Sequence, residues 1–177
     1  MDTVYFDLET QRTLNDVEGR KSELKMSVGV IYSTGEQAYS IYQEHEAGEL
    51  IARLQRADLV VGYNIVNFDY EVLLGYAGLD LGYSIHTLDL LADIERSLGR
   101  RVSLESVAQA SLGFGKIADG LDAIRWYREG RLADIAKYCC YDVKVTRLIH
   151  EYGVAQGCVA FLDRTGARQT IPVNWSR

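Results

Sequence analysis

The apolar positions along the chain predict strands near its start and helices in the remainder. Buried or alternating apolar stretches, bounded by turn residues, predict strands at residues 3–8, 26–32, 37–42 and 58–63. Apolar residues at helical spacing predict helices at residues 46–56, 68–76, 87–98, 104–112, 121–129 and 132–151. The second and third strands form a hairpin, so part of the sheet must be antiparallel. We therefore expect an α/β domain with a mixed central sheet flanked by helices.

Three stretches fall outside this pattern. Residues 11–25 are polar and charged, and we expect an exposed loop leading off the first strand. Residues 83–86 are expected to be a short extended piece. Residues 158–173 have the pattern of a second hairpin, which could add to the sheet edge, cover the fold or begin a further segment. We accordingly divide the chain into a domain at 1–155 and a C-terminal extension at 156–177.

Composition narrows the class of protein. The chain has 177 residues, 47% hydrophobic and 25% charged, which is typical of one globular domain. No apolar run approaches the roughly 18 residues of a membrane span, and the N-terminus leads directly into the first strand, so we expect a cytoplasmic protein without membrane partners. The net charge of −6 argues against binding to nucleic acid by bulk charge alone, but it allows an acidic site neutralised by metal ions. The cysteines, without a Cys-x-x-Cys motif, indicate reduced thiols.

Two carboxylates lie at the end of the first predicted strand. Asp7 and Glu9 are two residues apart, so they share one face of the strand. Like charges held this close repel unless a cation lies between them. Oxygen ligands favour Mg²⁺ or Mn²⁺. The alternative is an ordinary strand end with two solvated acids.

Two further acids follow other predicted elements. Asp69 lies near a helix start after the strand at 58–63, where α/β folds place their sites, although an acid there can also simply favour the helix dipole. Tyr138 and Asp142 are four residues apart and share one face of the last helix. The alternative for Asp142 is a surface salt bridge with Lys144 or Arg147.

Taken together, these motifs resemble a known family. They are Asp7-Leu8-Glu9, the stretch Gly-Tyr-Asn-Ile-Val-Asn-Phe-Asp at 62–69, and Tyr-Cys-Cys-Tyr-Asp at 138–142. Over residues 1–152 the chain resembles the tyrosine-bearing branch of the DEDD superfamily of 3′–5′ exonucleases, which has a ribonuclease H-like fold. The motifs, with the stretches 102–108 and 112–116, are most similar to the proofreading domains of family B DNA polymerases. Small exonuclease domains attached to helicases are also similar. No polymerase domain fits in this length.

The resemblance implies a metal-dependent 3′–5′ exonuclease that removes nucleotides from single-stranded DNA, with a role in DNA repair. Two divalent ions, Mg²⁺ or Mn²⁺, would be held by Asp7, Glu9, Asp69 and Asp142. Asp7 would bridge the ions, Glu9 and Asp142 would complete the ion that activates water, and Asp69 would support the other. Tyr138 would orient the attacking water.

The resemblance also implies substrate contacts near the acids. Leu8, Thr10, Asn64 and Phe68 would touch the terminal nucleotides, although a core role for Phe68 is an equal alternative, and Lys116 could meet a phosphate. A helicase or a polymerase is the expected protein partner. Two other functions stay open, namely an exoribonuclease of the same fold and a non-catalytic nucleic-acid-binding module attached to such a partner.

Overall fold

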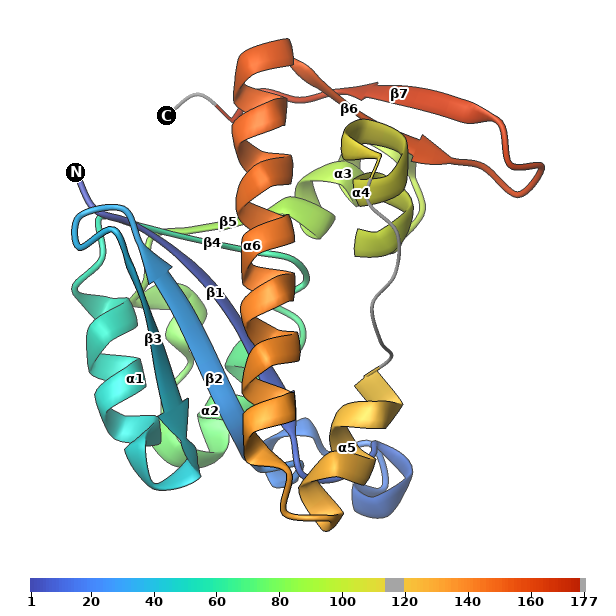
Figure 1. The fold of residues 1–177 in the computed structure, drawn as a ribbon. Helices are drawn as coiled ribbons and strands as arrows, with labels where there is room; N and C mark the ends of the chain where they lie inside the picture. The colour runs from blue at the N-terminus through green and yellow to red at the C-terminus, as the bar shows by residue number, and fades with distance from the viewer. Residues whose placement is uncertain (114–119, 176–177) are drawn as a thin grey trace.

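The structure, a computed structural model, describes residues 1–113 and 120–175, and its centre is a mixed five-stranded sheet (Figure 1). The strands, in their order across the sheet, are β3 (Ala38–Gln43), β2 (Met26–Ser33), β1 (Thr3–Thr10), β4 (Leu59–Gly62) and β5 (Thr87–Asp89). β1, β2 and β3 pair antiparallel, whereas β4 pairs parallel with both β1 and β5. The expected α/β fold with a mixed sheet is thus confirmed.

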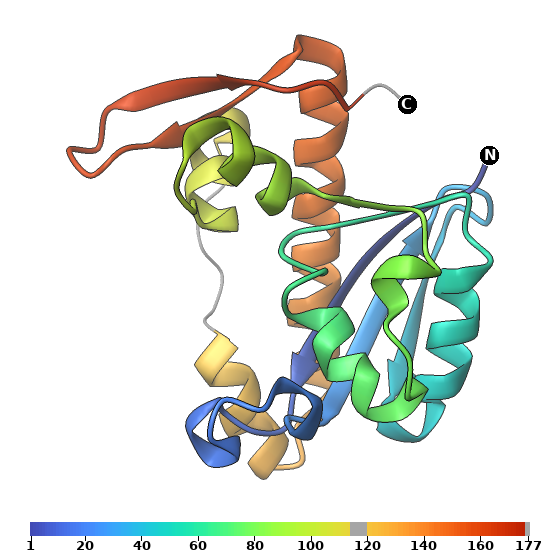
Figure 2. The same ribbon diagram turned by 180° about the vertical axis from the view of Figure 1, so that it is seen from behind.

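Alternation along β1 sends its side chains to two separate cores. Val4, Phe6 and Leu8 are buried with residues of α1 (Ala47–Gln55) and α2 (Asp69–Ala77), which cover one face of the sheet. Tyr5 is buried on the opposite face, against α6 (Leu132–Gln156). Figures 1 and 2 show these two layers from both sides. Because Asp7 and Glu9 have the same parity as Tyr5, β1 presents both carboxylates toward α6.

Three shorter helices complete the α6 side of the sheet. They are α3 (Leu90–Leu98), α4 (Leu104–Leu112) and α5 (Gly120–Arg128). Ser103 caps α4, because its hydroxyl accepts a hydrogen bond from the Ser106 N–H at 3.2 Å. No helix of the described residues is long and apolar enough to cross a membrane.

The region around residue 87 differs from the sequence prediction. Residues 83–86 are not a strand: a 3-10 helix spans Leu81–Tyr83, and the strand is β5, which lies within the stretch predicted to be helical. α3 begins only at Leu90, after Asp89 has capped it by accepting a hydrogen bond from the Ala92 N–H. A strand of three residues is too short to show a period of two.

The predicted loop at 11–25 is more ordered than an exposed loop. It contains 3-10 helices at Asn15–Val17 and Lys21–Glu23. Val17 and Leu24 are buried in the core beneath α1 and α2. The backbone packs so closely on α2 that a Cβ on Gly75 would collide with the carbonyl oxygen of Ser22. The segment is thus mostly exposed, as predicted, but Val17 and Leu24 anchor it to the core.

The C-terminal hairpin forms its own sheet and does not extend the central one. β6 (Cys158–Leu162) pairs antiparallel with β7 (Arg168–Pro172). The Ser106 and Ser111 hydroxyls of α4 hydrogen-bond to the backbone of β6. Trp175, which follows β7, is buried and donates from Nε1 to Asp93 at 2.7 Å. The hairpin thus covers one end of the fold. It does not add to the edge of the central sheet, which was one of the three alternatives for residues 158–173.

Candidate active site

Three carboxylates converge where β1 passes beneath α6. Asp7 and Glu9 from β1 and Asp142 from α6 each offer an oxygen atom, and these atoms lie within 4.8 Å of one another. All three side chains are half-buried. Among the described residues, neither partner of the salt-bridge alternative pairs with Asp142: Arg147 lies 3.6 Å from Glu151, and Lys144 makes no ion pair. The structure therefore brings together acids that are 133 to 135 positions apart in the sequence (142 − 9 = 133 and 142 − 7 = 135).

Burial and mutual repulsion make this cluster costly to ionise. Burial, followed by the charge of Asp142, raises the pKa of Asp7 well above its usual value. Burial also raises the pKa of Glu9, and the charges of Asp7, Asp142 and Asp69 add to the effect. Burial raises the pKa of Asp142 to about 6, and the hydrogen bond from Tyr138 partly opposes this shift. A bound cation would stabilise the ionised carboxylates and so lower these pKa values.

Asp69 lies beside this group, at the first residue of α2. It is buried, and its Oδ1 accepts a hydrogen bond from the Leu8 N–H at 3.0 Å, so it is fixed to β1 between the two strand acids. Burial and the charge of Asp7 raise its pKa, and the Leu8 N–H partly offsets them. In the described part of the chain, the three-oxygen cluster does not include Asp69.

Two neighbouring residues of α6 hydrogen-bond to the acids. The Tyr138 hydroxyl donates to the Asp142 carboxylate, and burial raises the pKa of this phenol far above its usual value, so it stays protonated at neutral pH. The Cys139 thiol is buried and lies 3.3 Å from both the main-chain oxygen and Oδ2 of Asp7, as the donor to each. The sequence indicated only a reduced thiol at Cys139, because the contact spans 132 positions.

A cavity of about 460 Å³ opens beside the acids. Asp7, Glu9 and Asp69 line it. All four residues expected to contact substrate also line it, namely Leu8, Thr10, Asn64 and Phe68. Phe68 packs against the core of α1 and α2 as well, which fits the core alternative for this side chain, and its contact with substrate stays a prediction. The remaining walls come from residues 12–15, Leu24, Tyr63 and α5. Tyr63 belongs to the stretch 62–69 that the sequence singled out, whereas the sequence did not indicate Leu24 and α5.

The turn that carries Asn64 is held by two residues that the sequence prediction missed. Asn64 has a φ of +70°, in the left-handed region that costs most residues energy. The Asp89 carboxylate accepts hydrogen bonds from the N–H groups of Asn64 at 2.8 Å and Val66 at 3.0 Å. Arg101 donates to the Asn64 side-chain oxygen. Asn64 is thus fixed in place at the cavity wall.

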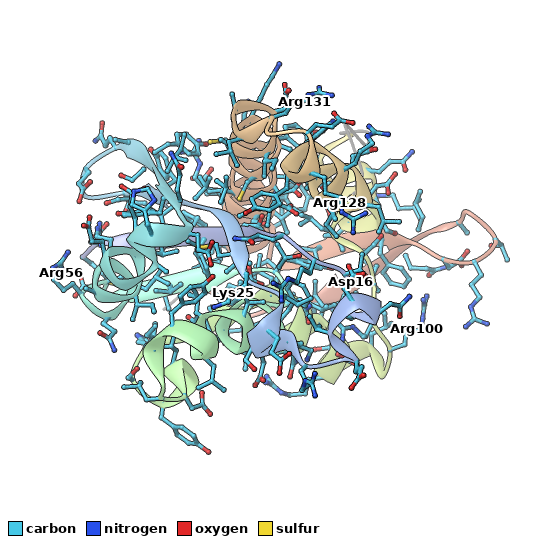
Figure 3. The ribbon with its side chains drawn as sticks, turned by 90° about the horizontal axis from the view of Figure 1, so that it is seen from below. Asp16, Lys25, Arg56, Arg100, Arg128 and Arg131 are labelled. Atoms are coloured by element: carbon cyan, nitrogen blue, oxygen red, sulfur yellow. The ribbon has the colours of Figure 1, made fainter. Side chains whose placement is uncertain are left out.

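The basic residues of the 11–25 segment differ in whether they reach the cavity. Arg12 lines the cavity, whereas Lys21 donates to the Asn67 carbonyl and Lys25 lies over the Tyr76 ring. Asp16 of this segment and Arg128 of α5 lie 3.5 Å apart and face each other in Figure 3, so this ion pair links the segment to α5. Lys116, the expected phosphate contact, lies outside the described residues.

Comparison with known proteins defines the class. A family model described as the RNase H superfamily matches residues 4–154, so the chain belongs to the RNase H superfamily. This membership supports a nuclease that uses divalent metal ions and acts on nucleic acid.

One solved structure that matches is the family B DNA polymerase from the hyperthermophilic archaeon Pyrobaculum calidifontis, with a TM-score of 0.67 at 13% sequence identity. The match covers 87% of this chain but 24% of the polymerase chain, and at this identity it shows a shared fold. A search of curated proteins finds no match.

Proposed function

We propose that this protein is a metal-dependent 3′–5′ exonuclease acting on single-stranded DNA, in the tyrosine-bearing branch of the DEDD exonucleases. The observation that carries the proposal is the meeting of Asp7, Glu9 and Asp142 within 4.8 Å, with Asp69 hydrogen-bonded to β1 beside them. The Tyr138 hydroxyl, donating to Asp142, completes the set. The fold it shares with a family B DNA polymerase agrees with this assignment.

The residues fit divalent metal ions. Every donor is a carboxylate, which suits Mg²⁺ or Mn²⁺, and the cluster of half-buried like charges has raised pKa values that a cation would relieve. Asp7, Glu9 and Asp142 would hold one ion, and Asp7 with Asp69 a second. When bound, such ions lower the pKa of a water molecule and stabilise the charge on the departing 3′ oxygen.

The side chains around the acids account for the remaining steps. Tyr138 cannot act as a base at neutral pH, because its pKa is raised, so its hydroxyl positions the attacking water by a hydrogen bond. Leu8 and Phe68 offer apolar surface to the terminal base, and Thr10 and Asn64 offer polar atoms to its sugar and phosphate. An opening of about 460 Å³ beside the acids suits the end of a single strand better than a continuous duplex.

The test is hydrolysis of end-labelled single-stranded DNA and RNA, each with Mg²⁺, Mn²⁺ or EDTA. We expect a ladder that shortens one nucleotide at a time from the 3′ end of DNA, and no products in EDTA. Asp7→Ala and Asp142→Ala should remove this activity while the fold persists. Glu49→Ala is the control, because Glu49 is an exposed acid on α1, across the sheet from the site. Mn²⁺-dependent 3′ trimming that survives in Asp7→Ala would contradict the proposal, and internal cuts would replace it with an endonuclease.

A further inference from the structure

A second hollow, of about 570 Å³, lies between β3, α5 and α6, and its walls are rich in aromatic rings. Four aromatic residues line it: Tyr39, Trp126, Tyr138 and Tyr141. Trp126 packs edge-on to Tyr138 with ring centroids 6.3 Å apart, and Tyr39 is 40% exposed. Trp126, Tyr138 and Tyr141 pack against the core but stay only partly buried, so part of each side chain is left to line the hollow.

The charges around this hollow favour an anion, although the chain as a whole is acidic. Its two acids are paired, since Asp122 lies 2.9 Å from Arg125 and Asp134 lies 2.8 Å from Arg131. Lys137 and Lys144 lie seven residues apart on one face of α6, and both are exposed. Within the described ranges, neither lysine makes an ion pair. The uncompensated charge at the rim is therefore positive.

The hollow adjoins the candidate active site through Tyr138. The ring of Tyr138 lines the hollow, and its hydroxyl donates to Asp142 at the acid cluster. α5 separates the two openings: Leu121 and Ile124 line the cavity beside Asp7 and Glu9, whereas Asp122 and Trp126 line the hollow. If the last nucleotide of a DNA strand occupies the cavity, the preceding nucleotides must extend away from the acids. The hollow lies on the other side of α5, next to Tyr138, and offers a surface for them.

We propose that this aromatic hollow binds the nucleotides preceding the scissile phosphate in single-stranded DNA, with bases stacked on Trp126 and Tyr39 and phosphates near Lys137 and Lys144. The assignment rests on the proposed function, since it follows the same strand away from the acids. Aromatic faces combined with basic side chains are the general means by which proteins hold single strands without reading their sequence. The hollow would supply affinity that the acidic chain otherwise lacks.

Tryptophan fluorescence of the full chain in EDTA tests the proposal without hydrolysis. The chain has two tryptophans, and Trp175 is only 2% exposed, so Trp126 is the one that a ligand can reach. We expect an eight-nucleotide oligothymidylate to quench the emission, and we expect Trp126→Leu to lose this response. The same variant should bind a labelled oligonucleotide about 10-fold more weakly, because base stacking on an aromatic ring contributes to affinity.

A charge variant keeps the test independent of packing around Trp126. Lys137→Gln with Lys144→Gln should raise the Kd for the oligonucleotide about 10-fold and reduce the slope of log K against log salt by about 1.4. Arg56→Gln is the control, because Arg56 is exposed at the end of α1 and lies well away from Arg131 and α5 in Figure 3. In the hydrolysis assay, the double variant should raise KM and leave kcat unchanged.

Two results would overturn the proposal. If the emission does not respond to saturating oligonucleotide, the hollow does not bind single-stranded DNA. It would then be free for another occupant, such as a protein partner or a second copy of the chain. Equal Kd values for the double variant and Arg56→Gln would do the same. Either result is compatible with metal-dependent hydrolysis, so failure of this inference is distinguishable from failure of the exonuclease proposal.

Discussion

β1 has acidic residues near both ends, and their surroundings shift their pKa values in opposite directions. Asp2, just before the strand, accepts hydrogen bonds from Arg53 at 2.6 Å, the Ser33 hydroxyl at 2.7 Å and the Gly35 N–H at 2.9 Å. Burial alone would raise the pKa of Asp2, but these contacts outweigh burial and lower it to about 2. Asp7 and Glu9, at the other end, lie beside further acids, with the Cys139 thiol donating to Asp7, and their pKa values are raised.

Under the proposed function, this difference separates a structural acid from acids that hold a metal ion. At Asp2 the fold itself supplies the cation and the donors, so the charge ties β1 to α1 and the turn after β2. At Asp7 and Glu9 the fold gathers like charges and leaves the cation to be supplied from solution. The electrostatic repulsion among Asp7, Glu9 and the neighbouring acids makes this end of β1 a candidate metal centre. The following predictions test this contrast.

Loss of the Tyr138 hydroxyl should have the largest effect on the rate of hydrolysis. Tyr138→Phe removes a hydrogen bond to a charged group and to the attacking water, so kcat should fall about 10- to 100-fold. The ring remains, so binding of single-stranded oligonucleotide in EDTA should be unchanged. Single-turnover hydrolysis and fluorescence titration measure the two quantities. An unchanged kcat would remove Tyr138 from the mechanism.

Removal of Asp2 should affect stability and leave the chemistry intact. Asp2→Ala leaves Arg53 without its closest partner, and we expect the free energy of unfolding to fall by about 2–3 kcal/mol. Activity per folded molecule should be unchanged, because Asp2 lies at the far end of β1 from the acids. Denaturant unfolding and hydrolysis rates below the transition provide the measurements. Loss of activity without loss of stability would reverse the assignment of the two ends.

The two ends should respond to pH in opposite directions in the metal-free protein. The folded-state pKa of Asp142 is about 6, above its unfolded value, so the folded protein binds extra protons between about pH 4 and 6. Its contribution to the free energy of unfolding therefore falls by about 3 kcal/mol as pH rises through this window. Asp2, with a pKa of about 2, contributes stability above about pH 4 that is lost as pH falls toward 2.

Unfolding of the wild type and Asp142→Asn across pH 4–8 in EDTA measures this effect. Asp142→Asn should match the wild type at pH 4 and exceed it in stability at pH 8. Excess Mn²⁺ should raise the stability of the wild type at pH 8 and have little effect on the variant. A wild type that gains stability between pH 4 and 6 relative to Asp142→Asn would contradict the raised pKa.

The Cys139 thiol should have the smallest effect of the four. It is a donor that orients the Asp7 carboxylate, so Cys139→Ala should weaken Mn²⁺ binding a few-fold, roughly the value of one weak hydrogen bond. Cys139→Ser keeps a donor and should recover most of the loss. Calorimetric titration of each variant distinguishes this from a packing effect, in which serine would be at least as harmful as alanine.

The sequence could predict those parts of the site that depend on regular periods. Alternation in β1 places Asp7 and Glu9 on one face, and helical spacing places Tyr138 and Asp142 on one face, so the two pairs could be foreseen. The position of Asp69 after β4 followed from the general location of sites in α/β folds. The main sheet and most of the helices could be predicted for the same reason.

The remaining features depend on contacts that leave no periodic signal. Asp89 holds the turn at Asn64 across 25 positions, and Arg101 reaches the same residue across 37. The α5 wall of the cavity depends on how that helix packs, not on any motif within it. β5 escaped prediction because it is short, and the anchoring of the mostly exposed 11–25 segment escaped it because only Val17 and Leu24 are buried.

Titration of the metal-free protein with Mn²⁺ is the most direct test of the central claim, that the acids at the C-terminal end of β1 form a metal centre and Asp2 does not. The account predicts that the wild type and Asp2→Asn bind Mn²⁺ equally at pH 8, and that Asp7→Asn loses this binding. It also predicts weaker binding at pH 5, where protons compete for the same oxygens. Equal Mn²⁺ binding by Asp7→Asn and the wild type would contradict the account.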